Sequence, residues 1–192
     1  MRRRPYLQSQ LGGECGLYSI INAFDLLYPG PLTDDAAERL KGHLCRALGG
    51  TLADVLAEGC ERPVMEGLLR AAQAWTAAQG WTPWRWRAAH PAPPLSAAEF
   101  WDWLTVDLAR PRTTAIVGFG SHTRPDTRYV AHWSVVEHLW PVQIGLRDSA
   151  GYDRIRRDET GIGSEAGWII EDCFILERWA WAPIRRPRAG NG

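Results

Sequence analysis

The sequence predicts an α+β fold, in which helices come first along the chain and an antiparallel sheet follows. Two observations lead to this prediction. Between residues 15 and 109 apolar residues mostly recur at helical spacing, and Pro-Gly or Gly-Gly pairs separate the segments. From residue 113 onward the spacing becomes that of strands. Helices followed by strands are typical of an α+β arrangement.

Five helical segments are expected from their start and stop signals. The first begins at Cys15 and ends near Tyr28-Pro29-Gly30. Thr33 caps the second, which runs to about Leu48. The third and fourth cover 51–58 and 63–79, and Ser96 forms a capping box with Glu99 at the start of a fifth, which ends near residue 109.

The strands are expected from alternating or continuous apolar runs. An early strand lies in 81–87, where tryptophan and arginine alternate so that Trp84 and Trp86 share one face. The later strands are expected at 113–117, 131–138, 143–147, 152–155 and 168–181. Loops are expected at 118–128 and 158–167. Pro141 lies in the connection between the strands at 131–138 and 143–147, which form a hairpin.

A chain of 192 residues is long enough for one domain with a sizeable core. We expect a single domain at 1–182, with a helical lobe at about 12–110, a sheet lobe at about 111–182 and a basic flexible tail at 183–192. The formal net charge of zero argues against nucleic acid as the main partner, and no apolar run is long enough to span a membrane. No apolar segment follows the first arginines, so we expect a cytoplasmic protein without an export signal. The oligomeric state stays open.

Cys15 has the local surroundings of a reactive thiol. It follows Gly12-Gly13 and opens an apolar helix, with Leu17, Ile20 and Phe24 on one face. The free N–H groups and the positive end of the helix dipole at this position favour a thiolate. Cys15 is therefore our candidate nucleophile.

The other cysteines lie in apolar surroundings and are expected to be small core residues: Cys45, Cys60 and Cys173. No C-x-x-C pair is present, and histidines and cysteines lack the spacing of metal ligands. We therefore expect no metal, no cofactor and no disulfide framework, and we rank a metal enzyme last among the possible functions.

A cysteine nucleophile needs a base and a group that orients the base. His132 opens a predicted strand directly after a loop and is our candidate base, while His138 lies too far along the same strand. The hairpin at Pro141 brings Asp148 back to the level of His132, so Asp148 is the candidate orienting carboxylate and Asp153 a weaker one.

These residues together resemble the papain-like cysteine peptidases, most closely the bacterial double-glycine leader peptidases and their solitary relatives. The resemblance rests on Cys15 at a helix start with glutamines before it, the His132-Trp133 pair and Asp148 downstream. It implies a helical lobe with the cysteine and a sheet lobe with the histidine and aspartate. It also implies a glutamine amide in the oxyanion hole, usually six residues before the cysteine.

Two glutamines flank that position, because Gln8 lies seven and Gln10 five residues before Cys15. Either could serve the oxyanion together with the backbone N–H of Cys15. In this fold a neighbouring aromatic often shields the His–Asp hydrogen bond from water, and Trp133 is the residue we expect there.

The function that follows is hydrolysis of a peptide or isopeptide bond in a peptide or protein substrate, through a thioester on Cys15. The same triad would also serve an acyltransferase or transpeptidase, or a glutamine deamidase, because nothing in it selects the group that resolves the thioester. A further alternative is a catalytically silent papain-like module that only binds.

Overall fold

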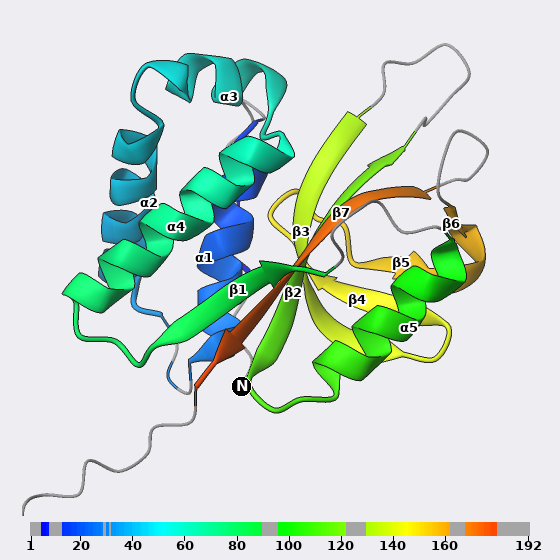
Figure 1. Cartoon of the computed structure of the whole chain (residues 1–192). Helices are drawn as coiled ribbons and strands as arrows, with labels where there is room; N and C mark the ends of the chain where they lie inside the picture. Colours follow the sequence, from blue (N-terminus) through cyan, green and yellow to red (C-terminus); the bar gives the residue numbers. More distant parts are fainter. Residues whose placement is uncertain are drawn as a thin grey trace, which may run out of the picture.

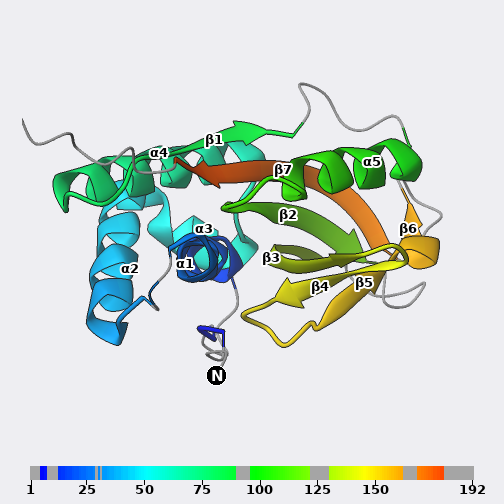
Figure 2. The same ribbon diagram turned by 90° about the horizontal axis from the view of Figure 1, so that it is seen from below.

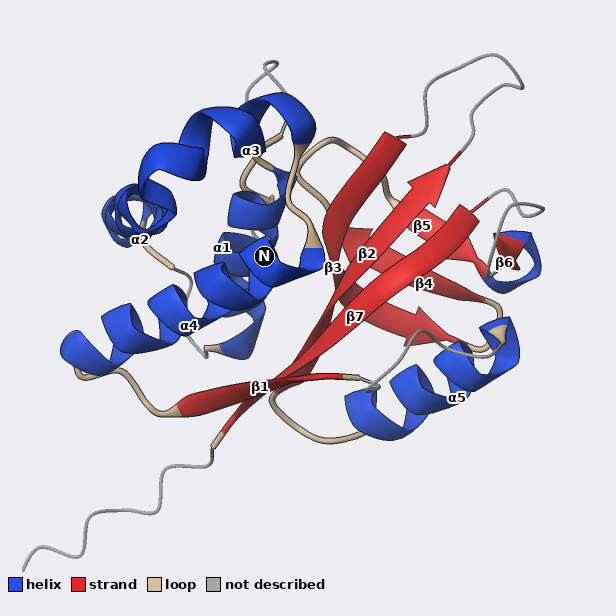
Figure 3. Cartoon of the chain, turned by 45° about the horizontal axis from the view of Figure 1, so that its top comes forward, coloured by secondary structure: helices blue, strands red, loops and turns tan. Residues whose placement is uncertain are grey.

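The computed structural model describes residues 5–7, 13–28, 30, 32–89, 96–121, 130–161 and 168–179. Helices and a largely antiparallel sheet make up this part of the chain, in agreement with the predicted α+β class (Figures 1 and 3). The helices are α1 (Cys15–Leu27), α2 (Asp34–Leu48), α3 (Leu52–Glu58), α4 (Arg62–Ala78) and α5 (Ala97–Leu108). The strands are β1 (Trp84–Ala88), β2 (Thr113–Ser121), β3 (Val130–Trp140), β4 (Gln143–Arg147), β5 (Arg154–Arg156), β6 (Thr160–Gly161) and β7 (Trp168–Arg178).

The helix boundaries follow the predicted signals closely. The Thr33 hydroxyl accepts a hydrogen bond from the N–H of Ala36 at the start of α2, and Ser96 accepts from the N–H of Glu99 at the start of α5. Each bond satisfies an N–H group that has no partner within the helix. β2 differs from expectation, since it continues to Ser121 where a loop was predicted from residue 118. Gly118 lies within this longer strand. The Trp133 ring comes so close to it that a Cβ would lie within 2.9 Å of the ring, which explains the glycine at this position.

The strands are ordered β1-β7-β2-β3-β4-β5, with the short β6 beside β7. All pairs are antiparallel except β6 with β7. β3 and β4 form the predicted hairpin, in which Val135 lies opposite Arg147. This register carries Asp148, the next residue, to the level of Ser134, two residues from His132.

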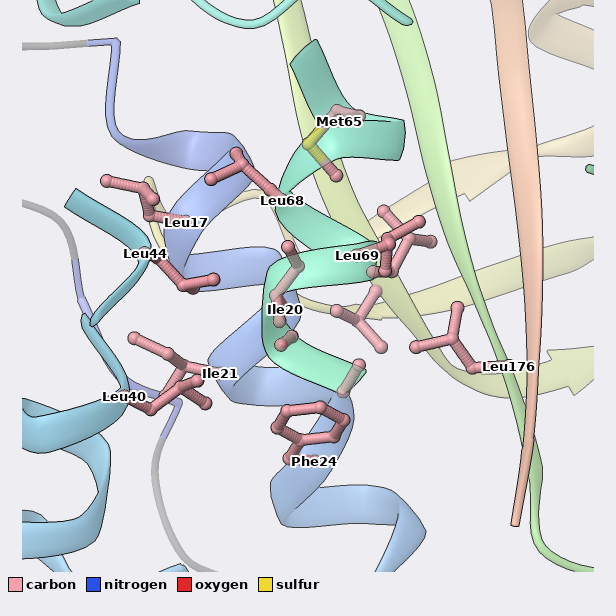
Figure 4. Close-up of a cluster of buried hydrophobic side chains, with 14 of the residues drawn as sticks. Leu17, Ile20, Ile21, Phe24, Leu40, Leu44, Met65, Leu68, Leu69 and Leu176 are labelled. Carbon is pink, nitrogen blue, oxygen red and sulfur yellow. The ribbon is translucent and has the colours of Figure 1, made fainter. Parts of the chain in front are cut away.

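Helices cover both faces of the sheet. One core joins α1, α2 and α4 to one face, and α1 lies between α2 and β3 when viewed from below (Figure 2). In Figure 4 the α1 side chains Leu17, Ile20 and Phe24 lie among side chains of α2, α4 and β7. A second core places α5 on the opposite face, against residues of β2, β4 and β7.

The boundary expected between the lobes, near residue 110, does not match this packing. β1 pairs with β7, and α5 buries Phe100, Trp101 and Leu104 against the sheet. The helical spacing of residues 97–108 is correct, but spacing does not reveal which layer an amphipathic helix covers. The helical layer that positions Cys15 therefore consists of α1 to α4 only.

Candidate active site

Cys15, His132 and Asp148 come together from three elements of the fold. Cys15 is the first residue of α1, His132 lies near the start of β3, and Asp148 follows the last residue of β4. The Nε2 atom of His132 lies 2.7 Å from Oδ2 of Asp148, and the Cys15 side chain lies close enough to His132 to raise the pKa of its ring. Because Nε2 faces Asp148, Nδ1 is the ring nitrogen left for the sulfur.

All three side chains are withdrawn from solvent, with residue exposures of 5%, 6% and 2% in chain order. Burial alone lowers the pKa of His132, but the hydrogen bonds and negative charges of Asp148 and Cys15 outweigh it and raise the pKa to about 9. At neutral pH the imidazole of His132 is therefore favoured in its charged form, beside the Asp148 carboxylate.

Asp148 is held in place by the backbone that follows it. Its Oδ1 atom accepts hydrogen bonds from the N–H groups of Ala150, at 2.7 Å, and Tyr152, at 3.1 Å. Burial raises the pKa of Asp148, yet the hydrogen bond and charge of His132 more than offset it, so that the pKa lies below its usual value. Ser134 faces this carboxylate without completing a hydrogen bond of good geometry and adds a smaller lowering.

An aromatic cluster of Phe119, Tyr152 and Trp168 packs beside His132. The His132 ring centroid lies 5.4 Å from that of Phe119 and 5.1 Å from that of Tyr152, and Trp168 contacts both aromatic rings. This cluster occupies the position that we expected for Trp133. A strand alternates its side chains between its two faces, so the residue next to His132 points away from it.

Trp133 has a different role on the opposite face of β3. Its Nε1 atom donates a 2.6 Å hydrogen bond to the carbonyl of Cys60, and its ring stacks on Phe174. This bond fixes the segment between α3 and α4 beside Cys15. The backbone N–H of Gly16 in turn hydrogen-bonds to the Cys60 sulfur. A Cβ on Gly16 would lie 2.7 Å from that sulfur, so only glycine fits there without a shift.

The remaining cysteines differ from Cys15 in their surroundings. All four thiols are free. Burial raises the pKa of Cys60 to about 12 and also raises the pKa values of Cys45 and Cys173. Cys60 and Cys173 are buried, as predicted, while Cys45 is only half-buried. Among the described residues, Cys15 is the cysteine whose side chain raises the pKa of His132.

An ion pair between α1 and α2 lies at the start of α1. Glu14 precedes Cys15, and its buried carboxylate lies 3.1 Å from the ammonium group of Lys41 on α2. Lys41 also donates a 2.8 Å hydrogen bond to the Tyr18 hydroxyl. It is the only lysine among 22 basic residues, and sequence reasoning gave it no part in the site. Its isolation in an arginine-rich chain was the signal that could have pointed to it.

The other predicted site residues are placed as follows. Gln8 and Gln10 lie outside the described residues. The Asp153 side chain is exposed, while its backbone carbonyl accepts from the N–H of Leu146. His138 packs on Trp140, several residues along β3. The structure thus brings together the three preferred residues and leaves the weaker alternatives apart from them.

Within the described ranges, no group of three or more histidine, cysteine or acidic side chains is arranged to hold a metal ion. In the same part of the chain, no helix has both the length and the apolar character needed to cross a membrane. No protein-family model matches the chain, and no curated protein matches it either.

Proposed function

We propose that the protein is a papain-like cysteine peptidase, which hydrolyses a peptide or isopeptide bond through a Cys15–His132–Asp148 triad. One observation carries the proposal: the His132 ring lies 2.7 Å from the carboxylate after β4 and is close enough to the Cys15 side chain at the start of α1 for that side chain to raise its pKa. A nucleophile, a base and an orienting group in that relation are what thiol catalysis requires.

The first half of the reaction forms a thioester. In the starting ion pair His132 already holds the proton of Cys15 at Nδ1, and the thiolate attacks the carbonyl carbon of the scissile bond. The negative charge that develops on the carbonyl oxygen is stabilised by the N–H of Cys15 and by the amide of Gln8 or Gln10. The imidazolium then gives its proton to the leaving nitrogen, the C–N bond breaks, and the acyl group remains on Cys15.

The second half regenerates the thiol. His132 removes a proton from water, the resulting hydroxide attacks the thioester carbonyl, and the acid product leaves as the sulfur recovers the proton from His132. Asp148 keeps Nε2 protonated throughout, so that Nδ1 can accept and return the proton. The aromatic cluster excludes water from the His132–Asp148 bond and thereby strengthens it.

Hydrolysis is tested with a mixture of synthetic peptides in ¹⁸O-labelled water, read by mass spectrometry. We expect new peptide C-termini that carry the label, their loss in Cys15→Ala, and their retention in the matched variant Cys45→Ala. Labelled glutamate in uncleaved peptides would show a deamidase, and amides of an added amine would show an acyltransferase. If a reactive Cys15 produces none of these products, the proposed activity is wrong.

A further inference from the structure

A pocket lies at the far end of α1 from Cys15. It has a volume of about 490 Å³ and is lined by residues of α1, the segment before α2, the turn before β1 and the end of β7. Such a volume is in the range that small-molecule sites occupy. Phe24, the lining residue nearest to Cys15 along α1, is separated from Cys15 by about 14 Å of helix.

The lining is mostly aromatic and aliphatic. Phe24, Tyr28 and Trp81 contribute three aromatic rings that contact one another, and Leu32 adds an aliphatic side chain. The Tyr28 hydroxyl is already engaged, since it donates a 2.7 Å hydrogen bond to the carbonyl of Thr82. A ligand that fills this space must therefore be apolar over most of its surface.

One charged side chain stands among these walls. Arg178 is the only charged residue among the described residues that line the pocket. Its guanidinium carbon lies 5.2 Å from the centre of the Tyr28 ring, and its buried Nε–H has no hydrogen-bond partner. No carboxylate of the described residues forms an ion pair with it, and Asp25 on α1 is bonded to Arg147 instead. A buried cationic donor without an acceptor is costly unless a ligand supplies one.

We propose that this pocket binds a small apolar or aromatic molecule that carries a carboxylate. The rings contact the apolar body, and Arg178 receives the carboxylate through charge-assisted hydrogen bonds, in the fork geometry that guanidinium and carboxylate share. The site is distinct from the Cys15 chemistry, because none of the residues that line it belongs to the triad.

Binding is measured by isothermal titration calorimetry with two probes of nearly equal shape, indole-3-acetate and the neutral indole-3-acetamide. The full-length chain should bind the acid about tenfold more tightly than the amide, as expected for one charge-assisted contact. Arg178→Met should reduce this preference to less than about twofold, and Arg178→Lys should keep part of it. The matched control Arg156→Met removes an exposed arginine of β5 and should leave both affinities unchanged.

Circular dichroism and the thermal midpoint of each variant establish that it is folded. The proposal is overturned if neither probe binds at millimolar concentration, or if the acid and the amide bind equally to the wild-type chain. It is also overturned if folded Arg178→Met retains the full preference for the acid. A separate binding measurement with Cys15→Ala should give wild-type affinities, so failure of the proposed peptidase activity would not affect this result.

Discussion

Arg147, the last residue of β4, forms a buried ion pair with Asp25 on α1. The pair joins the helix that begins at Cys15 to the strand that leads into Asp148. Both side chains are about 5% exposed or less, and Asp25 also accepts a 2.8 Å hydrogen bond from the N–H of Leu32. The distance between nucleophile and carboxylate is therefore set by this ion pair as well as by the core.

Arg147→Met should destabilise the fold, because it leaves the Asp25 carboxylate buried without its counter-charge. We expect a loss of about 3–5 kcal/mol in the free energy of unfolding. The double variant Arg147→Met/Asp25→Asn should recover part of that loss, since the buried Asp25 carboxylate has then been replaced by a neutral amide. Urea unfolding followed by fluorescence measures both. A single variant as stable as the wild type would show that the pair does not hold the two elements together.

Gly13 sets the entry into α1. Its φ of +70° lies in the left-handed region, and a Cβ would come within 2.4 Å of the backbone carbonyl oxygens of Leu56 and Val55. Gly13→Ala should therefore lower the free energy of unfolding by at least about 1 kcal/mol and slow the alkylation of Cys15. Gly67→Ala is the control, because Gly67 is an exposed α4 residue with open space around it and should gain roughly 0.5–1 kcal/mol. Equal effects at both positions would contradict this account.

The raised pKa of His132 makes stability depend on pH. Folding moves the pKa from the ordinary value of 6.5 to about 9, so the folded chain keeps a proton that the unfolded chain has lost between these values. The stabilisation is complete below about pH 6.5 and is lost as pH rises through about 9, a change of about 3 kcal/mol. Asp148→Asn should flatten this fall, and Asp153→Asn should preserve it. Urea unfolding between pH 6 and 10 gives the result, and a fall of equal size in Asp148→Asn would refute the assignment.

Lys41 balances the negative charge of Glu14 beside the candidate nucleophile. Lys41→Met should slow alkylation of Cys15 by about tenfold near pH 6, because it removes the positive charge beside the Glu14 carboxylate, whose negative charge disfavours a second one next to it. Glu14→Gln in the same background should restore the rate by removing that carboxylate. Alkylation rates from mass spectrometry decide the matter, and a slow double variant would mean that Lys41 acts only through packing.

The elements of the fold were predictable where local signals are strong. Thr33 and Ser96 mark helix starts through their own side-chain oxygens, and the turn after Trp140 sets the register that brings Asp148 near His132. The packing of α5 on the sheet was not predictable, because its apolar face fits either layer equally well.

The same distinction applies within the site. Cys15, His132 and Asp148 could be identified from the sequence, because their order and spacing along the chain are typical of a catalytic triad. The contacts that support them depend on pairs far apart in sequence, such as Arg147 with Asp25 or Trp133 with Cys60. Trp133 was misplaced for a related reason: its nearness to His132 in sequence puts it on the opposite face of β3.

The most direct test is the rate of alkylation by iodoacetamide at each cysteine as a function of pH, in wild type and in His132→Ala. Near pH 6 we expect Cys15 to react far faster than the other three, whose pKa values are raised by burial: Cys45, Cys60 and Cys173. His132→Ala should abolish that advantage. If Cys15 reacts no faster than the others in the folded wild-type protein, the thiolate–imidazolium pair does not exist and the peptidase proposal fails.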